Sequence, residues 1–238
     1  MDADSPLAVS ATTAIKSGDV AALEALLAEQ PGLAREWVRD ADGCERSLLH
    51  LLTDWPGHVP NAADVVDLLV DAGADVNAQF HGRHAETPLH WAASSDDLEA
   101  LDALVEAGAD VEAPGAVLGG GPPMADAVGF GQWHAARRLL EHGAQTNLWQ
   151  AAALGQIERV EELCSEGAPS GDEIDAAFWQ ACHGGQRETA EYLFERGADV
   201  NRIGWNRRTP LDVALTQDHA ETAALADWLR AQGATTSA

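Results

Sequence analysis

The sequence is poor in lysine, tyrosine and cysteine, and the shortage of lysine goes with a strongly acidic balance. Lys16 is the only lysine among 238 residues, and the formal net charge is −25. A chain this acidic repels phosphate backbones and anionic membrane surfaces. We therefore expect no nucleic-acid and no membrane partner, and the charge favours a basic one. An acidic surface that serves only solubility is the alternative explanation.

The three cysteines and the beginning of the chain indicate a cytoplasmic protein. Cys44, Cys164 and Cys182 are too few and too far apart for a disulfide framework, and reduced thiols suit a cytosol. The chain has no apolar run of about 18 residues, and the acidic start MDADSPLAVS lacks the basic and apolar segments of a signal peptide. Hydrophobic residues make up 46% of the chain, which is enough to build a core.

Two short motifs recur along the chain and bracket pairs of helices. Within the best copy, Thr87 is expected to cap a helix, Pro88 suits its first turn, and Gly108 ends the second helix in a left-handed conformation. Most intervals between the closing glycines are 30 to 36 residues. The copies are SLLH (47–50), TPLH (87–90) and TPLD (209–212) at the openings, and DAGADVN (71–77), EAGADVE (106–112), EHGAQTN (141–147) and ERGADVN (195–201) at the ends.

A period near 33 residues combined with T-P-L-H-x-A resembles the ankyrin-repeat family over nearly the whole chain. The resemblance implies an all-α solenoid of about seven helix-turn-helix units with short β-finger loops, because one such hairpin cannot bury its own apolar face. We expect a single domain, 1–238. Its units are a cap at 6–34, internal units at 39–77, 78–112, 113–146, 147–167 and 168–201, and a second cap at 202–235.

Three units depart from the regular pattern. The unit at 39–77 carries the insertion TDWPGHVPNAAD between its helices, the unit at 113–146 begins with the long finger APGAVLGGGPP, and the unit at 147–167 has almost no finger. Strings such as HAETPLHWAASSDD and FWQACHGGQ resemble a recurrent bacterial type of ankyrin-repeat protein. Arginine in place of lysine, with abundant alanine, agrees with a GC-rich bacterial genome. This closer resemblance does not indicate an activity.

In the ankyrin family, partners are contacted by the fingers and by the end of each inner helix, which together line a concave groove. The corresponding positions here carry aromatic, imidazole and carboxylate side chains. Tryptophan is suited to anchoring a partner, since it combines a large apolar area with one N–H donor. The candidate binding residues are Asp54, Trp55, His58, His81, His84, Glu86, Trp91, Ser95, Asp96, Phe130, Trp133, His183 and Trp205.

His81 and His84 lie three residues apart in a finger, where they could share a metal ion with Glu86 nearby. A pair of histidines without a further metal-binding motif is a weak signal, so a solvated loop is the favoured interpretation. We therefore expect no metal site, and the sequence indicates no cofactor.

The segment SSDD at 94–97 could supply a catalytic carboxylate, but we favour a capping role. In that interpretation Ser94, Ser95 or Asp96 accepts a backbone N–H at the start of the second helix. His183 is the best single candidate for a functional histidine, because it falls on a groove position of its helix.

Two functions of different classes are consistent with these residues. The favoured one is a non-enzymatic recognition module, expected to be a monomer, that binds a protein or peptide through the concave groove. The alternative is a small-molecule site or an enzyme, with His183 and Asp54 or Asp96 as acid and base. The alternative predicts that Trp55, Trp91, Phe130 and His183 converge on one enclosed pocket of a few hundred Å³.

Overall fold

The computed structural model describes residues 1–216 and 220–237, and side chains within 220–222 are not described. The chain divides into two compact units, residues 1–144 and 145–238, and each is described by itself. The expectation of a single domain stays a prediction. Within the described ranges, no helix combines the length and apolar character needed to cross a membrane.

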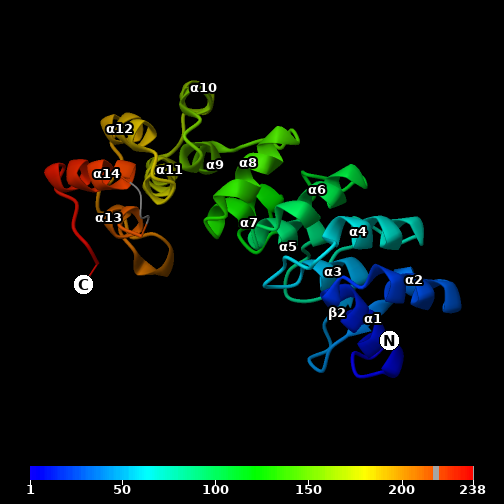
Figure 1. Cartoon of the computed structure of the whole chain (residues 1–238). Coiled ribbons are helices and arrows are strands. Elements are labelled where there is room, and N and C mark those ends of the chain that lie inside the picture. The colour runs from blue at the N-terminus through cyan, green and yellow to red at the C-terminus, as the bar shows by residue number, and fades with distance from the viewer. Residues whose placement is uncertain (217–219, 238) are drawn as a thin grey trace. The chain divides into compact units, whose positions relative to one another are not determined.

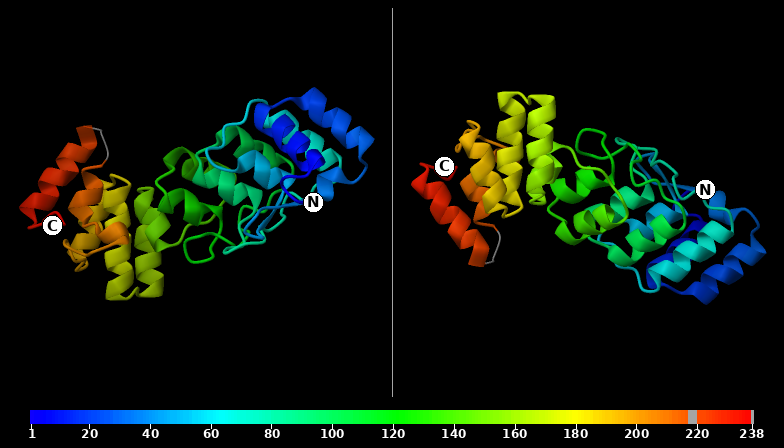
Figure 2. Two further views of the ribbon diagram at one scale, coloured as in Figure 1. Left: turned by 90° about the horizontal axis from the view of Figure 1, so that it is seen from below. Right: turned by 90° about the horizontal axis from the view of Figure 1, so that it is seen from above.

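The first unit consists of four helix pairs and one small hairpin. Helices α1, α3, α5 and α7 contact each other in succession, and so do α2, α4, α6 and α8, which gives the two rows seen in Figures 1 and 2. The bounds are α1 Pro6–Ser17, α2 Val20–Glu29, η1 Leu33–Arg35, β1 Trp37–Arg39, β2 Glu45–Ser47, α3 Leu48–Thr53, α4 Ala62–Asp71, α5 Pro88–Ser94, α6 Leu98–Glu106, α7 Pro123–Gly129 and α8 Trp133–Glu141.

The residues of α5 and α6 show why the chain folds into such pairs. Thr87 is the N-cap of α5 and Pro88 is its first residue, as the sequence predicts. Ala92 and Ala93 are fully buried. Their small side chains let neighbouring inner helices approach closely, and this close approach covers them. Helix α6 is followed by Gly108 at φ +96°, a conformation that glycine adopts without steric cost. The two helices thus bury each other and turn the chain back.

Buried histidines tie two inner helices, α3 and α5, to the finger that follows each of them. The Nε2 of His50 lies 3.0 Å from the carbonyl oxygen of Glu86, and that of His90 lies 3.2 Å from the carbonyl oxygen of Gly121. A carbonyl only accepts, so both rings carry their hydrogen on Nε2. Burial lowers the pKa of His50 and of His90 to about 4, and both rings are neutral at pH 7.

Both irregular segments that the sequence singles out are folded onto the repeats. The insertion occupies residues 54–61 between α3 and α4, and the backbone N–H of His58 donates to Asp97 Oδ2 at 2.6 Å. The long finger turns back on itself, with the N–H groups of Gly115 and Ala116 donating to the carbonyl of Gly121. Gly115 has φ +143°, and a Cβ there would lie 2.2 Å from the carbonyl oxygen of Ala85 in the preceding finger.

The second unit repeats the same design. Helix α11 contacts both α9 and α13, while α10, α12 and α14 pair with them. Trp179 is buried, and its indole N–H donates to the carbonyl of Arg208 at 2.9 Å, so it ties a helix to the following loop as the histidines do in the first unit. The bounds are α9 Leu148–Ala153, α10 Ile157–Gly167, α11 Gly171–His183, α12 Arg187–Glu195, η2 Trp205–Arg207, α13 Pro210–Ala214 and α14 Ala220–Ala231.

Candidate functional site

One position of three consecutive repeats in the first unit, just beyond or at the end of the inner helix, contributes to a single cavity. Trp55, Ser95 and Phe130 each stand seven residues after the first residue of α3, α5 and α7, respectively. All three line a cavity of about 190 Å³. The repeat therefore brings together side chains that are about 40 residues apart in sequence.

Six of the residues predicted from the sequence meet at this cavity. The six are Asp54, Trp55, Glu86, Trp91, Ser95 and Phe130. Trp55 is 81% exposed and Phe130 is 40% exposed, so these two rings are accessible to a partner from outside. Val117 of the long finger also lines the cavity, and thus the enlarged loop contributes to it.

Trp91 is held in place by neighbouring rings. Its indole meets His50 edge to face, with ring centroids 4.8 Å apart, and Phe80 lies 5.2 Å away. The guanidinium carbon of Arg46 stands 5.8 Å from the centre of the Trp91 ring, a distance at which a cation is attracted to an aromatic face. The Trp91 part of the cavity wall is therefore held by packing and has the cation of Arg46 on one side.

Glu86 is the most unusual residue of the cavity. Its backbone carbonyl accepts hydrogen bonds from His50 and from the N–H of Phe80, so its position is fixed. Its side chain is inside the protein, since the residue is only 7% exposed. The Oε2 atom is buried and finds no hydrogen-bond partner in the part of the chain that the structure describes. A buried acceptor without a donor costs about 1–3 kcal/mol, and more when it is charged.

Asp126 is a second buried carboxyl group in the same cavity. It lies in the middle of α7, is 1% exposed, and its Oδ1 is 3.5 Å from the backbone N–H of Leu118. Burial raises the pKa of Asp126 to about 7, and the charge of Glu86 adds to the increase. Asp126 is absent from the candidates chosen by sequence, which followed the ends of helices and the fingers.

Basic side chains lie at the rim of the cavity beside Asp54. The carboxylate of Asp54 is 3.1 Å from Arg46 Nη1, and its backbone carbonyl accepts from the Nζ of Lys16 at 3.0 Å. Arg46 also pairs with Asp40. These three residues and Asp54 line a second cavity of about 300 Å³. The only lysine and Arg46 are therefore already engaged next to the first cavity, not in it.

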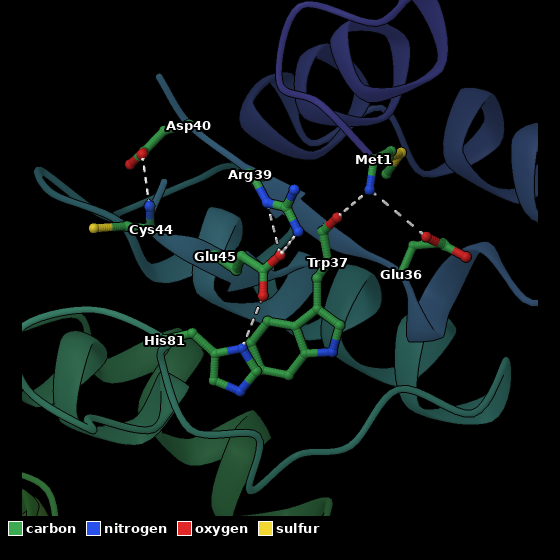
Figure 3. A network of polar contacts seen from close by, with 8 residues as sticks. All are labelled: Met1, Glu36, Trp37, Arg39, Asp40, Cys44, Glu45 and His81. Atoms are coloured by element: carbon green, nitrogen blue, oxygen red, sulfur yellow. Dashed lines mark hydrogen bonds and ion pairs between the residues drawn. The ribbon is translucent and has the colours of Figure 1, made fainter. Parts of the chain in front are cut away.

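His81 is held by contacts that the sequence does not predict (Figure 3). Its Nδ1 lies 3.0 Å from Glu45 Oε2, and its ring stacks on Trp37 with centroids 4.1 Å apart. Arg39 donates to the other oxygen of Glu45. Hydrogen bonds from His81 and Arg39 lower the pKa of Glu45. The HGRH finger is thus fixed to the β1–β2 hairpin through His81, although the His81 side chain is exposed, as expected for a solvated loop.

The SSDD segment corrects one expectation from the sequence. The cap of α6 is Asp97, whose Oδ1 accepts from the N–H of Ala100, and not Ser94, Ser95 or Asp96. Asp96 instead reaches the next unit, where its Oδ1 accepts from the N–H of Ala135 at 2.7 Å and its Oδ2 lies 2.8 Å from His134 Nδ1. The Asp96 carboxylate therefore stabilises the start of α8. The capping chemistry was predicted correctly, but for the wrong residues.

The remaining candidates lie outside the cavity. His58 belongs to the insertion and its Nε2 is 3.0 Å from the carbonyl oxygen of Ser95. His84 is a half-buried finger residue, and Trp133 is the half-buried first residue of α8. Neither is among the residues that line the cavity.

His183 and Trp205 belong to the second unit. The imidazole of His183 packs against Trp179 with ring centroids 5.3 Å apart, and burial lowers its pKa to about 4. Its ring is therefore neutral at pH 7, so it is not poised as a proton donor there. Trp205 is 58% exposed in η2. The role of both residues in binding stays a prediction.

The cavity in the first unit thus combines aromatic walls with two buried carboxyl groups. Carboxylates accept hydrogen bonds and attract cations, and aromatic faces attract cations as well. A ligand that carries N–H donors and a positive charge would satisfy both features. The chemistry fits binding of a cation.

Comparison with known proteins gives one family. The model described as "Ankyrin repeats (3 copies)" matches residues 11–115, 49–148 and 148–229. Among solved structures, the human ASB11 ankyrin repeat domain is similar, with a TM-score of 0.51 and 22% sequence identity over 93% of this chain and 96% of that one. At this identity the likeness shows the fold alone. The sequence motifs, the paired helices and the family match together lead to one conclusion: the chain belongs to the ankyrin-repeat family.

Proposed function

We propose that this chain is a non-enzymatic recognition module that binds a basic protein or peptide at the cavity of its first unit. Ankyrin repeats are in general protein–protein interaction modules. The observation that carries the proposal is the convergence of exposed aromatic rings, Trp55 and Phe130, with the buried carboxyl groups of Glu86 and Asp126.

Charge and size support this function over the small-molecule alternative. The net charge of −25 draws a basic partner towards the chain and raises the rate of association at low ionic strength. The cavity of about 190 Å³ is smaller than the roughly 300–1,000 Å³ that a drug-sized ligand occupies. A single side chain of a partner fits a space of that size, with the rest of the partner lying across the exposed aromatic rings.

The proposal is tested by selecting peptides from a random displayed library on the full chain and measuring their affinities by calorimetry. We expect the selected peptides to be basic, and we expect Trp55→Ala to weaken their binding by about tenfold or more, as for an aromatic anchor. Trp205→Ala removes an equally large, exposed ring from the second unit and is the matched control.

Three results would contradict the proposal. The first is a selection that yields no peptides. The second is a set of peptides without basic residues. The third is a loss of affinity in Trp205→Ala and not in Trp55→Ala, since that would place the binding surface in the second unit.

A further inference from the structure

Glu86 Oε2 requires a hydrogen-bond donor that the described part of the chain does not supply. The residue is fixed at its backbone by His50 and Phe80, and it is 93% buried, so the carboxylate cannot turn into bulk solvent without moving the finger. Because Glu86 lines the cavity, a ligand in the cavity can supply the donor. The missing partner of Glu86 must therefore carry an N–H or O–H group.

Asp126 indicates a second property of the missing partner, which is a positive charge. Two buried carboxyl groups, Glu86 and Asp126, line one small cavity, and the charge of Glu86 adds to the rise in the pKa of Asp126 that burial causes. A cation between them would relieve this repulsion and would favour the ionised form of Asp126. The same cation would be attracted to the faces of Trp91 and Phe130.

The size and shape of the cavity select among cations. Liquid water occupies about 30 Å³ per molecule, so 190 Å³ corresponds to about six waters, which is room for an ammonium group and a few methylene groups. An ammonium group is compact and presents three rotatable donors, whereas guanidinium is a wide planar fork. A quaternary ammonium has no N–H and would leave Glu86 without a donor. The cavity therefore favours a primary ammonium group on an alkyl chain.

We propose that the cavity receives the side chain of a partner's lysine, with Glu86 and Asp126 accepting hydrogen bonds from its ammonium group and Trp91 and Phe130 flanking its methylene groups. This proposal rests on the proposed function and names the residue that the partner inserts. The chain does not compete for its own site, because its single lysine, Lys16, is bonded to the carbonyl of Asp54.

The chemistry is tested without any peptide, so that it can fail independently of the proposed function. Butylammonium chloride is titrated into the full ¹⁵N-labelled chain, and the indole N–H signal of Trp91, assigned with Trp91→Phe, is followed by NMR. We expect a saturable shift. We expect none from tetramethylammonium chloride or from sodium chloride at equal ionic strength.

Isosteric variants test the two acceptors. We expect Glu86→Gln and Asp126→Asn each to weaken butylammonium binding by about tenfold, as for loss of one partner of a buried charge pair. Asp64→Asn is the matched control, because it removes the same charge from an exposed position on α4 and should leave the affinity within twofold. Thermal unfolding shows which variants are folded. If Glu86→Gln does not fold, Asp126→Asn alone serves as the test.

A second arm distinguishes a lysine side chain from a free amine. In the peptides selected for the full chain, each lysine is replaced in turn by Nε-acetyl-lysine and by arginine. We expect one position at which either change weakens binding by about tenfold or more. The proposal is overturned if tetramethylammonium binds as well as butylammonium, or if Glu86→Gln and Asp126→Asn both bind butylammonium with undiminished affinity. It is also overturned if butylammonium binds but no lysine of the peptides is sensitive to replacement, which would indicate a site for free amines.

Discussion

His50 Nε2 donates a hydrogen bond to the backbone carbonyl of Glu86 across 36 residues of sequence, and this bond fixes the backbone of a residue that lines the cavity. The histidine belongs to the opening motif of one repeat, and the acceptor belongs to the finger of the next. A contact that keeps two repeats together therefore also positions the most unusual acidic residue of the candidate site.

The buried histidines predict a loss of stability in mild acid. Folding lowers the pKa of His50 from 6.5 to about 4, so the unfolded chain binds more protons between these values. The contribution to stability is complete above pH 6.5 and is lost as pH falls towards 4, by about 3 kcal/mol for a shift of this size. His90 and His183 act in the same direction. Denaturant unfolding from pH 7.5 to 4 measures this slope.

Replacing His50 separates its share of that slope from the rest. We expect His50→Asn to lower the unfolding free energy at pH 7 by about 1–3 kcal/mol, because the Glu86 carbonyl loses its donor. We also expect a shallower decline of stability between pH 6.5 and 4. His134→Asn is the control, since its side chain is exposed, and it should change stability by less than about 1 kcal/mol. An unchanged slope in His50→Asn would contradict the assignment of a neutral buried imidazole.

Asp126 should oppose folding increasingly as pH rises from about 4 to 7, in the opposite sense to the histidines. Its pKa rises from 3.8 to about 7 on folding, so the penalty for ionising it is absent below pH 3.8 and complete above pH 7. We expect Asp126→Asn to gain stability relative to the native chain as pH rises from 4 to 8, by up to about 4 kcal/mol. Unfolding curves at each pH measure the difference, and Asp64→Asn should show no such trend.

The surroundings of Asp126 make this trend specific. The finger contributes Glu86, whose charge adds to the rise in the pKa of Asp126, and α5 contributes His90, which is neutral. Helix α8 also packs on α7. Its charged or titratable residues are His134, Arg137, Arg138 and Glu141. A gain in stability that is equal at pH 4 and pH 8 would indicate better packing rather than removal of a buried charge.

Because two fingers approach closely at Gly115, we expect a side chain at this position to lower the stability of the fold strongly. A methyl group there would meet the carbonyl oxygen of Ala85 at 2.2 Å, and φ is +143°. We expect Gly115→Ala to lower the unfolding free energy by about 2–4 kcal/mol, because both backbone strain and overlap must be relieved. Gly119→Ala is the matched control in the same finger, where φ is +75° but the space is open, and it should cost about 1 kcal/mol.

Asp97 is expected to contribute more than an ordinary helix cap. It accepts from the N–H of Ala100 and from the N–H of His58 in the insertion, and it is 2% exposed. Asp19 caps α2 through Ala22 alone at the surface. We expect Asp97→Ala to cost about 2–4 kcal/mol and Asp19→Ala about 1 kcal/mol. Equal losses in thermal or denaturant unfolding would show that the bond to the insertion adds nothing.

The repeat pattern predicts the fold because each of its signals acts within one unit. Thr87 and Pro88 begin a helix and Gly108 ends one, whatever lies elsewhere in the chain. The end of each inner helix follows from the same local pattern, and for this reason the sequence predicts Trp55 and Phe130 as candidates, which the structure places at one cavity.

The features of the fold and of the candidate site that the sequence does not predict are contacts between distant residues. Asp126 stands in the middle of a short helix, where a polar residue usually faces solvent, and it is buried because the finger carrying Val117 and Leu118 folds back over it. The stacking of His81 on Trp37 joins residues 44 positions apart. The division into units 1–144 and 145–238 has no polar linker to mark it, although the sequence has almost no finger at this point.

The seven-residue offset shared by Trp55, Ser95 and Phe130 has a consequence for how such a protein can change. In these three repeats the same position lines the cavity, while the capping, core and closing residues of the repeat lie elsewhere in the motif. Substitutions at this position can alter what is recognised without disturbing the packing of the stack. New specificities are thus accessible through single exchanges, one repeat at a time, on a scaffold that stays the same.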